Sequence, residues 1–321
     1  MLPFPVETPY RMRADLARCD GQPLPVGPDD WSVLQAKLAA LRNHPERVRV
    51  ADPRRTPAEL EEELAATLPT LAELRPDLLH PVGHRLDGVP ATGEDPASAV
   101  FADVHGRRWV FPRLGTEAAA LVRSVPGPSR LADALALSLP EDLVWMRDDG
   151  GAGRATLLHV AFPSHWAPDE RAGASLLELH GPVADGERLR AASAALMRAI
   201  VSMGPFRRHI WSITATPDLD RHPLTAGRPG GNANERGWFR VERQTTVPFP
   251  EAGLALFAIR VLVAPLQEVL AVEMDRAARL AASIRSMSPE VRVYKGVADP
   301  GLLERLDAAT ADAAPLEGAE F

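Results

Sequence analysis

The chain has 321 residues, a hydrophobic content of 45% and a formal net charge of −7 at pH 7. This length and composition are typical of a folded protein with one large core or two modest ones. The acidic balance and the lack of a dense basic run argue against a nucleic-acid-binding surface, because phosphate binding depends on clustered cations.

The sequence gives no sign of a membrane span or of export. No run approaches the roughly 20 consecutive apolar residues that a span requires, and the first residues do not combine a basic segment with an apolar stretch. We therefore expect a cytoplasmic protein without a membrane partner. The single Cys19 cannot form an internal disulfide or supply the thiolates of an iron–sulfur cluster.

Residues 1–140 predict a shell of helices and loops. An amphipathic helix is expected over Asp30–Leu41, where the apolar residues recur on one face. A second helix is expected over Thr56–Leu74, because a proline opens it and its first turn is acidic. A strand is expected over Arg107–Phe111 and another helix over Leu131–Leu139.

Residues 141–270 change to a strand pattern. Five strands are expected, at Leu143–Arg147, Ala155–Phe162, His209–Thr216, Trp238–Val247 and Leu254–Val263. Two helices, Asp169–His180 and Glu187–Ser202, are expected between the second and third strands. This order is the PAS order, and it predicts an α+β fold in which a PAS-like five-stranded antiparallel sheet carries helices on one face.

The remaining segment, residues 271–321, predicts C-terminal helices at Val272–Ser286 and Gly301–Ala314. We expect the three parts to form one compact unit. The N-terminal shell and the C-terminal helices would then both pack on the central sheet.

His180 is the first candidate for chemistry. An apolar helical run, LLEL, leads into His180, and Gly181 can take the left-handed conformation that ends a helix. One interpretation is a histidine that complements the helix dipole. The other is an axial haem ligand, which needs a neutral imidazole at the mouth of an apolar pocket. The residues alone leave both open.

Arg243 is the second candidate, because strand alternation places it on an apolar face. One face of WFRVERQTTV carries Phe239, Val241, Thr245 and Val247 beside Arg243, and the other carries Arg240, Glu242 and Gln244. A guanidinium on the apolar face could belong to a buried ion pair or reach out to solvent. Alternatively, it could face a bound gas or anionic ligand.

The other histidines give weaker signals. His159 and His165 are too far apart for adjacent helical turns, and the sequence of His80–His84 contains a proline and a glycine that oppose a helix. We assign none of them to a site.

Four blocks of the sequence resemble a known family. They are EDLVWMR (Glu141–Arg147), HVAFPSHWAPDERAG with LLELHGPV (His159–Val183), IWSITATPDL (Ile210–Leu219) and WFRVERQTTVPFPEAGLALFAIRVLVAPL (Trp238–Leu266). The family is that of the haem-dependent oxidative N-demethylases, whose haem subunit has a PAS-like fold. The resemblance covers residues 141–270 and, more loosely, the whole chain.

The resemblance implies roles for His180 and Arg243, and the mechanism that we build on it adds Glu242 as the neighbour of Arg243 in sequence. His180 would be the proximal ligand of a b-type haem, and Arg243 would lie near the distal pocket or bind a haem propionate. Arg243 would also stabilise negative charge that develops on bound oxygen. Glu242 would help to bind a protonated amine, although alternation points it away from Arg243.

The resemblance also implies an activity and its partners. The chain would be an oxygenase subunit that uses O₂ to demethylate a small secondary amine such as dimethylamine, with release of formaldehyde. Electrons would come from NADPH through a separate reductase with flavin and an iron–sulfur cluster. Ile210 stands before Trp211 where family members carry an asparagine, which leaves the amine open. The alternative is a haem- or small-ligand-binding PAS-like sensor without turnover.

Overall fold

The computed structural model describes residues 2–11, 16–27, 30–83, 99–151, 153–179, 192–226 and 237–313. Its main element is a seven-stranded sheet in the order β1-β8-β9-β10-β6-β7-β2, in which every neighbouring pair is antiparallel. The strands are β1 (Ala17–Arg18), β2 (Arg49–Ala51), β6 (Asp142–Arg147), β7 (Arg154–His159), β8 (Phe206–Thr214), β9 (Trp238–Phe249) and β10 (Leu254–Pro265).

The five strands expected from the sequence all form, as β6 to β10, and they are adjacent in the sheet. The α+β class with a large antiparallel sheet is therefore confirmed. The specific five-stranded PAS-like arrangement is not confirmed, because β1 and β2 extend the sheet to seven strands. These edge strands have two and three residues, too few for an alternation to be recognised.

The N-terminal helices cover one face of this sheet. They are α1 (Trp31–Asn43), α2 (Pro45–Val48), α3 (Pro57–Leu74), α4 (Thr116–Ser124) and α5 (Ser129–Ala136). Leu38, Leu64 and Leu135 of these helices share a core with Trp145 and Leu256 of the sheet. We call the sheet face that carries Trp145, Leu256 and Arg243 the N-terminal face.

The N-terminal region also contains a capped helix and a second sheet. Thr56 and Glu59 form a reciprocal capping box that fixes the start of α3, at the position that the proline and the acidic first turn predicted. A three-stranded sheet in the order β3-β5-β4 consists of β3 (His80–Pro81), β4 (Ala99–Ala102) and β5 (Arg108–Phe111).

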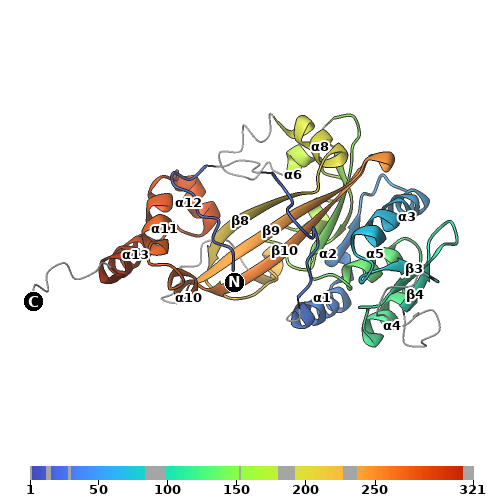
Figure 1. Ribbon diagram of the computed structural model, residues 1–321, viewed down its shortest axis with the longest axis horizontal. Helices are drawn as coiled ribbons and strands as arrows, with labels where there is room; N and C mark the ends of the chain where they lie inside the picture. The colour runs from blue at the N-terminus through green and yellow to red at the C-terminus, as the bar shows by residue number, and fades with distance from the viewer. Residues whose placement is uncertain are drawn as a thin grey trace, which may run out of the picture.

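Two helices cover the opposite face of the large sheet. They are α6 (Leu176–Leu179) and α8 (Ser193–Ser202), and Figure 1 shows them across β9 and β10 from α1. Leu176 and Met197 share a core with Val144 and Ala255. Helices therefore lie on both faces, whereas one face was expected. Hydrophobic periodicity identifies the apolar side of a helix but not the sheet face that it covers.

The expected helix Asp169–His180 does not form as one element. Residues Pro168–Glu170 form the 3-10 helix η2, and α6 starts only at Leu176. Gly173, between them, has φ of 77°, and a Cβ there would lie 2.6 Å from Asp52 Oδ1. Close packing against a distant loop thus interrupts the helical pattern. His180 itself lies outside the described residues.

The C-terminal helices cover the far end of the N-terminal face (Figure 1). They are α10 (Leu266–Leu270), α11 (Arg276–Arg285), α12 (Pro289–Lys295) and α13 (Pro300–Ala313), of which α12 was not expected. Leu280 and Ile284 of α11 share a core with Trp211 and Phe239 of the sheet. The short elements α9 (Pro223–Ala226) and η3 (Pro250–Ala252) lie in connections between strands. Within the described ranges, no helix has the length and apolar character needed to cross a bilayer.

Candidate functional site

The strand register separates the two predicted residues of β9. Glu242 and Thr246 are four residues apart, so they share a face, and Thr246 lies opposite Phe257, which in turn lies opposite Val144. Val144 belongs to the core that α6 joins. We call this the α6 face; it carries Arg240, Glu242 and Gln244. Arg243 is on the other side of the sheet, as alternation predicts.

On the N-terminal face, the arginines have carboxylate partners. Arg243 Nη2 donates to Glu141 Oε1 at 3.0 Å, and the Glu141 side chain is 2% exposed. In the neighbouring strand, Arg260 forms an ion pair with Asp30. Burial raises the pKa of Glu141, and the nearby arginines oppose that shift. The contact to Glu141 matches the ion-pair interpretation of Arg243.

Lys37 of α1 lies in the same region. Its ammonium donates to the backbone oxygens of Ala136, Leu139 and Glu141, and the side chain is fully buried. Burial lowers the pKa of Lys37 to about 8. The Lys37 ammonium thus has three backbone acceptors within the fold.

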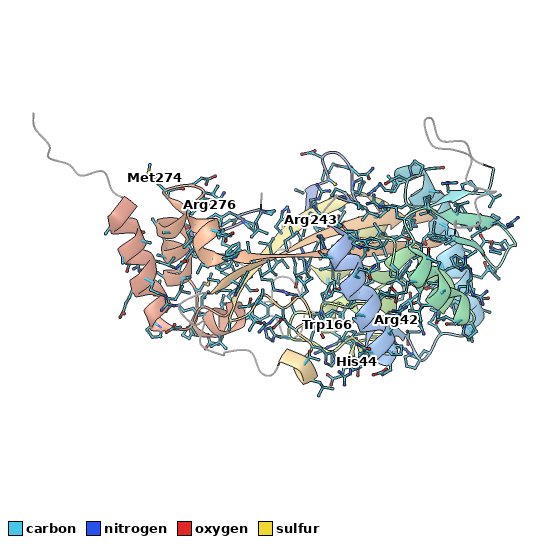
Figure 2. The ribbon with its side chains drawn as sticks, turned by 90° about the horizontal axis from the view of Figure 1, so that it is seen from below. Arg42, His44, Trp166, Arg243, Met274 and Arg276 are labelled. Carbon is cyan, nitrogen blue, oxygen red and sulfur yellow. The ribbon has the colours of Figure 1, made fainter. Side chains whose placement is uncertain are left out.

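Figure 2 shows Arg243 between the C-terminal helices, where Arg276 is labelled, and the end of α1, where Arg42 is labelled. Because α6 packs on the other face, the structure does not bring Arg243 together with the residues that lead to His180. The haem-related roles of His180 and Arg243 stay predictions.

On the α6 face, Glu242 is held by neutral side chains. Ser164 donates its hydroxyl hydrogen to Glu242 Oε1, and Gln244 Nε2 donates to Glu242 Oε2 at 2.8 Å. Arg240 Nε donates to Ser164 Oγ at 3.1 Å, and Arg208 Nε donates to Gln244 Oε1 at 2.7 Å. The Ser164 hydroxyl therefore connects Glu242 to Arg240, and the Gln244 amide connects Glu242 to Arg208.

Arg240 is buried with neutral partners. Its side chain is 1% exposed, and besides Ser164 it donates to the carbonyl oxygens of Phe162, Asp218 and Leu219. Burial lowers its pKa, while Glu242 opposes that shift. In the described part of the chain no carboxylate forms an ion pair with Arg240. Its hydrogen-bond partners are therefore all neutral, and the carboxylates that act on its charge, Glu242 first, do so without a direct contact.

Arg221 and His165 adjoin this network. Arg221 Nε donates to His165 Nε2 at 2.9 Å, and Arg221 Nη1 donates to Thr216 Oγ1 at 3.1 Å. The backbone of His165 has φ of 63°, which is uncommon for a residue other than glycine. Burial, followed by the charges of Arg221 and Arg240, lowers the pKa of His165 to about 4. The imidazole is therefore neutral at pH 7.

The α6 face carries both kinds of group that a haem contacts, and its apolar residues are packed against the sheet. A haem combines an apolar macrocycle with two anionic propionates, and this face combines apolar residues of α6 and α8 with buried arginines that have neutral partners. The apolar residues include Leu176, Leu179, Met197 and Ile200. Across the described residues, no three His, Cys, Asp or Glu side chains gather as a metal site would require.

The sequence identified Glu242 but missed its surroundings. Alternation in VERQT already placed Arg240 and Gln244 beside Glu242, so these two residues could have been included. Ser164, His165 and Arg221 lie in loops, where no periodicity indicates which side chains meet.

Comparison with known proteins gives the family. A sequence model of the family described as haem-dependent oxidative N-demethylase, alpha subunit-like, matches residues 97–301, which is more than half of the chain. No curated protein matches the chain. The matched range contains β6 to β10, the Glu242 network and the Arg221–His165 contact. The chain therefore belongs to the haem-dependent oxidative N-demethylase alpha-subunit-like family.

Proposed function

We propose that the chain is the haem-binding oxygenase subunit of an oxidative N-demethylase that acts on a small secondary amine such as dimethylamine. The family match over residues 97–301 carries this proposal, because the family description names both haem and oxidative demethylation. In the overall reaction, O₂ takes up a pair of electrons and a pair of protons. One oxygen atom leaves in formaldehyde and the other in water, and an N–H bond replaces the N–methyl bond.

Haem b, held through His180, would supply the site at which O₂ is bound and reduced. The other parts of the reaction fall to the chain itself. The protonated amine needs an anionic partner, and Glu242 is a carboxylate whose two oxygens are held in place by Ser164 and Gln244. A carboxylate held in this way can orient an ammonium group without rearrangement.

The neighbours of Glu242 suit the alkyl groups of such an amine. Ile210 of β8 and Val261 of β10 lie directly opposite Glu242 in the two adjacent strands, so apolar side chains flank the carboxylate on the same face. The ammonium would contact Glu242, and an alkyl group would contact Ile210, which is partly exposed while Val261 is buried. For Arg243 we propose a supporting role, in which its contact with Glu141 holds β9 to the N-terminal region.

A separate reductase would complete the reaction. The chain has one cysteine, Cys19, and an iron–sulfur cluster usually takes four thiolates. We therefore propose that electrons from NADPH arrive through a partner protein that carries flavin and such a cluster.

A visible spectrum of the purified protein after haem supplementation tests the proposal. The wild type should show a Soret band, and His180→Ala should lose it or shift it strongly. His209→Ala, a matched change of a half-buried histidine on the N-terminal face, should leave the spectrum unchanged. If the Soret band is retained in both variants, His180 is not the haem ligand.

Turnover is tested on the haem-loaded protein with a chemical electron donor, O₂ and dimethylamine. Formaldehyde should form in proportion to the amine consumed, and an amine-free reaction provides the control. A spectral shift on amine binding without formaldehyde would favour a PAS-like sensor that binds but does not turn over its ligand.

A further inference from the structure

His165 combines a strained backbone with a fixed position. A left-handed conformation costs roughly 1 kcal/mol for a residue other than glycine, and such strain concentrates at functional sites. At His165 the backbone is held by two hydrogen bonds: its N–H donates to the Arg221 carbonyl at 3.0 Å, and the Arg221 N–H donates to the Pro163 carbonyl at 3.0 Å. The two loops thus fix the imidazole relative to the sheet.

The contact with Arg221 also fixes the tautomer of His165. A guanidinium donates hydrogen bonds and cannot accept them, so His165 Nε2 must be the acceptor in the 2.9 Å contact with Arg221 Nε. A neutral imidazole carries one proton, which must then reside on Nδ1. The depressed pKa of His165, about 4, agrees with a neutral ring.

This Nδ1–H donor has no acceptor among the described residues, although the atom is buried. A buried donor without a partner costs roughly 1–3 kcal/mol, so a residue that is also strained calls for an explanation. Arg221 and Arg240 are both close enough to depress the pKa of His165, and both have neutral hydrogen-bond partners. A donor in this positive field suits an acceptor with a negative charge.

We infer that His165 Nδ1–H, together with Arg221, forms a subsite for a carboxylate, and that this carboxylate is a propionate of the bound haem. The inference rests on the proposed function, because it takes the ligand of the α6 face to be a haem. Ser164, the residue before His165, links this subsite to Glu242, so the propionate and the amine would be held by adjacent residues of one loop.

The test compares haem with its dimethyl ester, in which both propionates are neutral. The apoprotein is titrated with each compound, and the dissociation constants are taken from the Soret band. Wild type should bind haem more tightly than the ester by about tenfold or more, the effect of a hydrogen bond to a charged group. His165→Gly should reduce this preference about tenfold, and His165→Asn should retain part of it.

Glycine and asparagine both tolerate the left-handed backbone, so the two variants separate the loss of the donor from a failure to fold. His209→Asn changes a half-buried histidine on the opposite face and should leave the preference unchanged. Equal binding of haem and ester by the wild type, or an unchanged preference in His165→Gly, would overturn the inference. A wild type that binds neither compound would instead refute the proposed function.

The alternative ligand for the His165 subsite is the carboxylate of an amine substrate such as N-methylglycine. The same variants are therefore titrated with N-methylglycine and with dimethylamine after haem loading. If His165→Gly weakens N-methylglycine binding selectively and leaves the haem-to-ester preference intact, the carboxylate belongs to the substrate and the propionate assignment is wrong.

Discussion

Arginines stand on both faces of the large sheet, and their partners differ. On the N-terminal face, Arg243 pairs with Glu141 and Arg260 pairs with Asp30. On the α6 face, Arg240 donates to a hydroxyl and three carbonyl oxygens, and Arg221 donates to an imidazole and a hydroxyl. In β9, the guanidinium of Arg243 therefore contacts a carboxylate, whereas that of Arg240 contacts only neutral acceptors.

The difference separates structural charges from charges available to a ligand. A guanidinium paired with a carboxylate is neutralised within the fold, and removing one partner leaves the other buried and uncompensated. A guanidinium with neutral acceptors keeps its field, which a bound anion can use. We therefore expect the arginines of the N-terminal face to be structural and those of the α6 face to bind a ligand, and four changes test this expectation.

The largest effect is expected for Arg243→Met. This change leaves Glu141 buried without its partner and should lower the free energy of unfolding by roughly 3 kcal/mol. We take the lower end of the usual range because the Arg243 side chain is 19% exposed. Urea unfolding measures the loss, and adding Glu141→Met should recover part of it. Intact stability together with weakened haem binding would instead place Arg243 at the ligand.

The next effect concerns the amine. Glu242→Gln preserves the volume of the side chain but removes its charge, so the dissociation constant of dimethylamine should rise about 10- to 100-fold, as for a lost hydrogen bond between charged groups. The substrate-linked shift of the Soret band reports binding. Glu141→Gln, the matched change on the N-terminal face, should leave amine affinity unaltered. If both variants raise the dissociation constant of dimethylamine equally, the proposed difference between the two faces is wrong.

A smaller effect is expected at Ile210, which lies opposite Glu242. Ile210→Asn replaces an apolar flank of the carboxylate by an amide, and it should shift the ratio of kcat/KM for diethylamine and dimethylamine towards dimethylamine by about tenfold. Ile210→Val keeps the apolar character and should leave this ratio close to that of the wild type. An unchanged ratio in both variants would mean that the alkyl groups lie elsewhere.

A further effect, confined to acidic pH, is a pH dependence of stability. The pKa of His165 falls from 6.5 to about 4 in the folded state, through burial and the charges of Arg221 and Arg240. As the pH falls below 6.5, the unfolded chain takes up a proton before the folded chain does, so the wild type loses stability down to pH 4. Urea unfolding at these two pH values should show a loss relative to His165→Asn. If the free energies of unfolding of the wild type and His165→Asn differ by the same amount at both pH values, the pKa of His165 is not depressed.

The sequence could predict much of this fold because its strands and helix starts are local patterns. Alternation in WFRVERQTTV predicted that Arg243 and Glu242 lie on opposite faces, and the register confirms it. The capping residues of α3 likewise mark its first turn in the sequence. Both signals depend on residues close together in the chain.

The features that the sequence could not provide depend on distant contacts. The partner of Arg243 lies 102 residues away, at Glu141. Gly173 ends an expected helix because it packs against Asp52, which belongs to another part of the chain. The contact between His165 and Arg221 joins two loops, and no periodic pattern indicates that loops approach one another.

Strands β9 and β10 are 12 residues long, a span of roughly 40 Å, and this length has a mechanical consequence. Phe239 and Val241 anchor one end of β9 beneath the C-terminal helices, while Val247 and Phe249 anchor the other end among the N-terminal ones. Glu242 lies between these anchors and cannot be displaced without straining both. The backbone that carries the carboxylate is thus fixed on both sides, so we expect Glu242 to keep its position relative to both groups of helices.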